Sequence, residues 1–237
     1  MVTFRDRLLG TLRLLRPILE EPGVLVVGSE VPNLLQPDAA ATLVVSQDVD
    51  LAIPVDRVDR LKKRLREVEG LVQSAEEPSI FVPTSPTLVE ANFLGLDPAI
   101  RDASETYVLE DPELPLMVFG PIGLLRPGPV IDVEGLRIPL PRTADLMIEK
   151  LLTDRTGEKG ARDLLVVAGL LATTGPADLD EMVTRVGSLP AECRHTVRSG
   201  LTLLSLIEPR AGMPDPAPCR AQVARLLARI EGSTLDG

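Results

Sequence analysis

Hydrophobic positions follow two different periods along the chain, and the change of period divides it into two parts. Leucines at positions 8, 12, 15 and 19 recur at helical spacing and predict an amphipathic helix over residues 4–20. Short apolar runs bounded by proline and glycine follow until about residue 140 and predict strands. From Thr143 the spacing is helical almost to the end. The pattern predicts an α+β fold, α/β-like in residues 1–140 with a small mixed β-sheet flanked by helices, followed by an all-helical C-terminal domain in residues 141–237.

The first part contains the elements that bear on function. A buried strand is predicted over residues 24–27, ending in Gly28-Ser29, and a second strand runs into residue 53. A charged helix is predicted over 56–69. Further strands are predicted over 79–82, 88–94, 106–109, 116–119, 130–133 and 136–139, those beyond residue 97 completing the sheet. Helices in the second part are predicted over 143–153, 161–172, 177–186, 191–207 and 217–231.

Two aspartates occupy alternate positions of the second strand. Alternate residues of a strand face the same side, so Asp48 and Asp50 are predicted to lie together. Two like charges this close repel by about 4 kcal/mol at an effective dielectric near 20. A cation would remove that cost, and Mg²⁺ is the first candidate for an oxygen-only site. The glycine turn at Gly28-Ser29 can bring backbone N–H groups to a phosphate, so the pair of motifs indicates nucleotide chemistry. The alternatives are a solvated strand face and an ordinary turn.

Composition limits the classes of binding partner that the protein can have. The formal charge of −10 argues against a protein that coats duplex DNA or an anionic membrane. Aromatic residues make up 2% of the chain, too few for stacking single-stranded bases on rings. Cys193 and Cys219 are expected to be reduced thiols, and His195 a surface or packing residue. No signal-peptide pattern opens the chain, and the longest apolar run, residues 164–172, is too short to span a bilayer, so a cytoplasmic protein without a membrane partner is expected.

In the order of these motifs the chain resembles the nucleotidyltransferase superfamily, which has the polymerase-β-like fold. It looks closest to minimal bacterial nucleotidyltransferases of the abortive-infection toxin type. The resemblance covers roughly residues 20–172. It rests on Gly28-Ser29, on the run from Ser46 through Asp48 and Asp50, and on Lys150 and Lys159 near an apolar helix.

The resemblance implies a nucleotidyltransferase fold and an Mg²⁺-dependent (or Mn²⁺-dependent) transfer of a nucleoside monophosphate from an NTP to a hydroxyl acceptor. Asp48 and Asp50 would hold the metal. The nucleotide would be bound by residues of both parts of the chain: Gly28, Ser29, Ser46, Lys150 and Lys159. A third carboxylate on a later strand would complete a two-metal site and help to deprotonate the acceptor.

The chain departs from the family pattern at this third carboxylate. Asn92 stands at the matching position, and Glu90, two residues earlier on the same strand face, is the candidate substitute. Asp48, Asp50 and Glu90 are therefore the predicted metal ligands and catalytic residues. The alternative function is a catalytically degenerate relative that binds nucleotide or a partner protein. A toxin–antitoxin or phage-defence role is a third hypothesis. The acceptor stays open among RNA, protein and a small molecule, with the negative charge disfavouring RNA.

Overall fold

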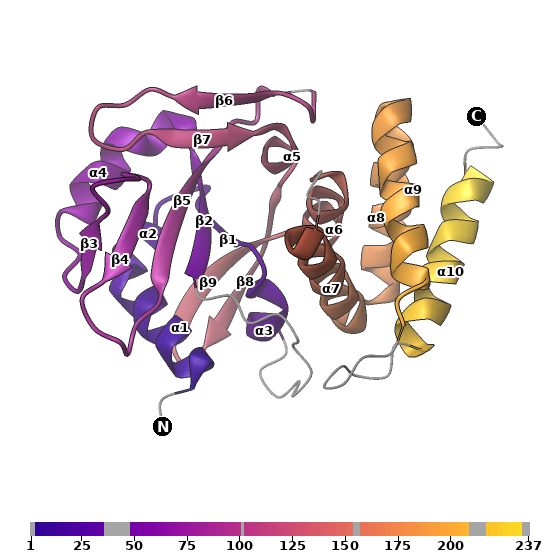
Figure 1. The fold of residues 1–237 in the computed structure, drawn as a ribbon, viewed down its shortest axis with the longest axis horizontal. Helices are drawn as coiled ribbons and strands as arrows, with labels where there is room; N and C mark the ends of the chain where they lie inside the picture. Colours follow the sequence, from indigo (N-terminus) through magenta and orange to yellow (C-terminus); the bar gives the residue numbers. More distant parts are fainter. Residues whose placement is uncertain (1–2, 36–47, 101, 154–156, 209–216, 234–237) are drawn as a thin grey trace. The chain divides into compact units, whose positions relative to one another are not determined.

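The computed structural model divides the chain into two compact units. The first comprises Met1–Val31 and Val45–Arg142, and the second comprises Pro32–Val44 and Thr143–Gly237. The residues described in the structure are 3–35, 48–100, 102–153, 157–208 and 217–233 (Figure 1).

Proline divides the first predicted helix of the first unit into two shorter helices. Thr3 caps α1 (Phe4–Leu14) by accepting the Asp6 main-chain N–H at 3.1 Å. Pro17 has no N–H to continue this helix, and it lies instead in the first turn of the separate helix α2 (Arg16–Leu19). A 3₁₀ turn, η1 (Val55–Arg57), leads into α4 (Val58–Leu65).

The larger sheet of this unit has mixed strand directions. Its described strands are β1 (Leu25–Val27), β2 (Asp48–Pro54), β3 (Leu71–Gln73), β4 (Ile80–Pro83), β5 (Glu90–Leu96), β6 (Thr106–Leu109) and β7 (Leu116–Phe119). Their order is β1-β2-β5-β4-β3, with β7 beside the second half of β5 and β6 beside β7. β2 and β5 are parallel, whereas β1 is antiparallel to β2 and β4 is antiparallel to β5. In Figure 1, α1, α2 and α4 lie on the same side of this sheet.

The last two strands of the first unit do not join that sheet, so the prediction that they complete it is wrong. β8 (Pro127–Val133) and β9 (Leu136–Pro141) form a two-stranded sheet of their own, reached from β7 through the short helix α5 (Gly120–Gly123). A turn with positive φ at Glu134 and Gly135 joins them. Prolines in both strands lack the N–H that a further strand would need, which keeps this ribbon narrow. The ribbon packs through β9 against β1 and α2.

The regular elements among the described residues of the second unit are all helices. Its helices after β9 are α6 (Thr143–Leu152), α7 (Gly157–Thr173), α8 (Pro176–Ser188), α9 (Ala191–Ser205) and α10 (Ala217–Ser233). The short helix α3 (Val31–Leu35) follows β1. Proline starts α8, and Pro190 occupies the N-cap position of α9, as the breaks in the hydrophobic pattern predict. Across the described residues, no helix has the length and apolar content needed to cross a membrane. The predicted α+β class, with a mixed sheet and a helical C-terminal part, is confirmed.

Candidate functional site

The chain turns sharply where β1 ends. Gly28 has φ +108°, a backbone conformation that residues with a side chain rarely adopt. A Cβ atom built on Gly28 would lie 2.5 Å from Asp50 Oδ2, closer than atoms can approach. Glycine is therefore required for two reasons, the backbone conformation and the nearness of the Asp50 carboxylate. The turn and the aspartate lie in contact, as the sequence predicts.

A single side chain contacts both aspartates of β2. Asn92 Nδ2 donates to Asp48 Oδ2 at 2.8 Å and to Asp50 Oδ1 at 3.2 Å. The two carboxylates therefore face the same side of the sheet, which confirms the period-two argument. Asn92 reaches them because β5 runs parallel to β2 with Asn92 opposite Asp50. Its amide hydrogens offset part of the repulsion between the carboxylates without a cation.

Glu90, the candidate third carboxylate, lies on the same strand as Asn92 and opposite Asp48 in the parallel register. Its side chain is half-buried. Burial raises the pKa of Glu90, and the negative charges of Asp48 and Glu77 add to the rise. The register thus gathers Asp48, Asp50, Glu90 and Asn92 on neighbouring positions of two strands.

One acidic residue of this region is missing from the sequence prediction. Glu30 follows the Gly28-Ser29 turn and has 0% of its surface exposed. Its Oε1 accepts the main-chain N–H of Asp50 at 3.1 Å. Burial raises the pKa of Glu30 well above its usual range, with a further contribution from the charge of Asp50. The sequence signal that could have revealed it is an isolated acid within residues 24–32, a run that is otherwise uncharged and is buried throughout.

The nucleotide contacts predicted outside this cluster have different surroundings. Ser29 lies in the turn and is buried, with 7% exposed. Ser46 and the side chain of Lys159 lie outside the described residues. Lys150 belongs to α6 of the second unit, where it is buried and its Nζ lies 3.1 Å from Glu149 Oε2. The Lys150 ammonium group, which the prediction assigns to a phosphate, is therefore partly neutralised by Glu149.

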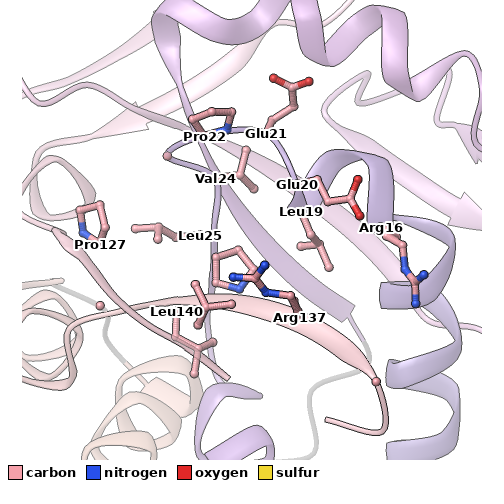
Figure 2. Close-up of a pocket in the computed structure, with 15 residues that line it drawn as sticks. Arg16, Leu19, Glu20, Glu21, Pro22, Val24, Leu25, Pro127, Arg137 and Leu140 are labelled. Atoms are coloured by element: carbon pink, nitrogen blue, oxygen red, sulfur yellow. The ribbon is translucent and has the colours of Figure 1, made fainter. Parts of the chain in front are cut away.

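A hollow of about 500 Å³ lies elsewhere in the first unit, at the start of β1 (Figure 2). Its lining combines apolar side chains with charged side chains of both signs, and includes Leu19, Val24, Leu25, Leu140, Arg16, Arg137, Glu20 and Glu21. The predicted site residues are absent from the described lining. The hollow is thus separate from Asp48 and Asp50, because Asp50 lies opposite Val27 at the other end of β1.

The donor atoms at the carboxylates suit a hard cation. Within the described ranges, no group of three or more His, Cys, Asp or Glu side chains is gathered as a metal site. Mg²⁺, however, is commonly held by one or two carboxylates together with substrate phosphates. The paired aspartates meet that smaller requirement. Glu30 Oε2 and Asn92 Oδ1 are, in addition, buried oxygens without a hydrogen-bond partner among the described residues.

Comparisons with known proteins add no assignment. No family model matches the chain, and no curated protein matches it.

Proposed function

We propose that the chain is a nucleotidyltransferase-like protein that transfers a nucleoside monophosphate from an NTP to a hydroxyl acceptor. The observation that carries this proposal is the pair of aspartates on one face of β2, bridged by one amide nitrogen and in contact with a glycine turn. A turn of this kind can present main-chain N–H groups to phosphate oxygens. Carboxylates beside it supply the charge that a phosphate-bound cation needs.

In this proposal, Asp48 and Asp50 hold Mg²⁺ or Mn²⁺ together with the phosphates of the nucleotide. The cation supplies charge neutralisation at the transferring and leaving phosphate oxygens when it is bound. Ser29 and the turn at Gly28 position the phosphates. Glu90, opposite Asp48 in the strand register, would accept the proton of the acceptor hydroxyl. These residues act by positioning and by electrostatics, which is what an in-line displacement at phosphorus requires.

Isothermal titration calorimetry of an NTP analogue with Mg²⁺ tests the binding part of the proposal. Asp48→Asn and Asp50→Asn each keep the side-chain volume and remove a ligand charge, so both should abolish metal-dependent binding. Asp59→Asn is the matched control, because the Asp59 side chain is 89% exposed and lies on α4. Unchanged binding by the two site variants, with wild-type binding intact, would contradict the site.

One observation favours the alternative, a relative that binds nucleotide or a partner without catalysis. The Asn92 amide already occupies both carboxylates, so a cation must compete with two hydrogen bonds. Turnover distinguishes the two functions. It is measured as pyrophosphate release from labelled NTP in the presence of Mg²⁺ or Mn²⁺, with a cell extract as the source of the acceptor. Asn92→Asp should raise that turnover if the missing carboxylate limits it. Nucleotide binding without turnover in either protein would support the binding function.

A further inference from the structure

Glu30 presents an energetic problem that the fold does not explain. A carboxyl group that is fully buried, with Oε2 lacking a partner among the described residues, costs free energy relative to an apolar side chain. Its neighbours in residues 24–32 are buried and uncharged. Packing alone would be served better by leucine or methionine at this position. We therefore look for the role of this carboxyl group in the residues that it contacts.

What Glu30 contacts is the candidate site. β1 ends at Val27, which lies opposite Asp50 in the register with β2. Glu30 Oε1 accepts the Asp50 N–H at 3.1 Å, the role that main-chain carbonyls play within a sheet. The side chain thus anchors β2 at the residue whose carboxylate is to bind the cation.

The same side chain also encloses the Asp50 carboxylate. A Cβ atom at Gly28 would lie 2.8 Å from Glu30 Oε2, 2.9 Å from Glu30 Oε1 and 2.5 Å from Asp50 Oδ2. The two carboxyl groups therefore border the same small space above the turn. Asp50 Oδ1 meanwhile accepts from Asn92 Nδ2 on the other side. Asp50 is held at its main chain by Glu30 and at its carboxylate by Asn92.

We infer that Glu30 is a positioning residue for Asp50: it anchors the Asp50 main chain and thereby orients the carboxylate toward the cation. The inference rests on the proposed function for its purpose, but the anchoring itself is a property of the protein without ligand. The anchoring bond uses Oε1 as an acceptor, which a carboxylate, a carboxylic acid and an amide can all supply. Glu30→Gln should therefore preserve the bond, and Glu30→Leu should remove it while filling a similar volume.

The first measurement is amide hydrogen exchange of the full chain, followed by NMR without metal. In Glu30→Leu, the Asp50 amide should exchange at least fivefold faster relative to the Ala52 amide of the same strand, because one hydrogen bond is lost locally. Global destabilisation would accelerate both amides together, so their ratio separates positioning from stability. Glu30→Gln should keep the wild-type ratio. Glu21→Leu is the matched control, a glutamate before β1 with 11% of its side chain exposed.

The second measurement is the Kd for Mn²⁺ by electron paramagnetic resonance. Glu30→Leu should raise the Kd roughly fivefold, and Glu30→Gln and Glu21→Leu should stay within about twofold of wild type. An unchanged exchange ratio or an unchanged Kd in Glu30→Leu would overturn the inference about Glu30. The proposed function would still stand in that case, provided that the wild-type protein binds Mn²⁺. Failure of the wild-type protein to bind Mn²⁺ would overturn the proposed function. The role of Glu30 in orienting a metal ligand would fall with it, even if the exchange ratio showed the anchoring bond.

Discussion

Replacement of Asn92 by aspartate is the most direct test of the electrostatics at the carboxylates. The change keeps the shape of the side chain but removes both hydrogen bonds from Nδ2, to Asp48 at 2.8 Å and to Asp50 at 3.2 Å. Hydrogen bonds to charged groups contribute about 1.5–3 kcal/mol each. The third carboxylate also adds repulsion of up to about 4 kcal/mol per neighbouring charge before proton uptake and solvent reduce it. The site is half-buried and the new carboxyl group can take up a proton, so we use the lower bound for the two hydrogen bonds and expect the free energy of unfolding to fall by about 3 kcal/mol.

A loss of that size should lower the Tm by roughly 6–12 °C for a chain of this length, as measured by differential scanning calorimetry in a chelating buffer. Mn²⁺ at one hundred times its Kd should return about 2.7 kcal/mol, so the variant should recover most of the loss. At the same Mn²⁺ concentration, wild-type protein should gain less, because the cation competes with the Asn92 amide and the wild-type Kd is therefore higher.

The control for this experiment makes the same amide-to-carboxylate change elsewhere in the sheet. Gln73 is exposed on β3, and its Nε2 donates to two main-chain carbonyls, of Pro78 and Glu113. Gln73→Glu therefore loses two hydrogen bonds but adds no negative charge beside Asp48 and Asp50. Mn²⁺ should not restore the stability that this variant loses. An Asn92→Asp protein with the wild-type Tm, or one that Mn²⁺ does not stabilise more than Gln73→Glu, would refute the reasoning.

Two further predictions concern the turn and the response of stability to pH. Gly28→Ala should lower the free energy of unfolding by about 1–3 kcal/mol in urea titrations, because it combines positive φ with a clash against Asp50. Gly135→Ala, where φ is also positive but a Cβ meets nothing within 4 Å, should cost less; equal losses would contradict the clash. Lys62 bonds Asp111 at 2.7 Å and holds the pKa of that carboxyl below its usual value, so this contribution to stability is present at neutral pH and is lost as the pH falls through the lowered pKa. Lys62→Gln should therefore lower the Tm at pH 7 and have little effect in strong acid, and a pH-independent difference would count against the pair.

Part of the candidate site is readable from local spacing. The separation of two residues between Asp48 and Asp50 places them on one strand face whatever the rest of the chain does, and the structure agrees. The assignment of Asn92 to the position of a third carboxylate rests on the family resemblance and stays a prediction. The hydrogen bonds of Asn92 to both aspartates depend on the parallel register of β5 against β2. That register brings Asn92 next to Asp48 and Asp50, which precede it in the chain by 44 and 42 positions.

The sequence by itself determined the two hydrophobic periods, the breaks at proline and glycine, and the face shared by Asp48 and Asp50. These follow from backbone geometry over a few residues, which does not depend on distant contacts. Only the tertiary structure decided that β8 and β9 form a sheet separate from the larger one. It also decided that the Glu30 side chain accepts a hydrogen bond from the main chain of Asp50, which follows it by twenty positions. Such pairings are chosen by the packing of whole elements, in which a buried charge is tolerated because of the group that it meets.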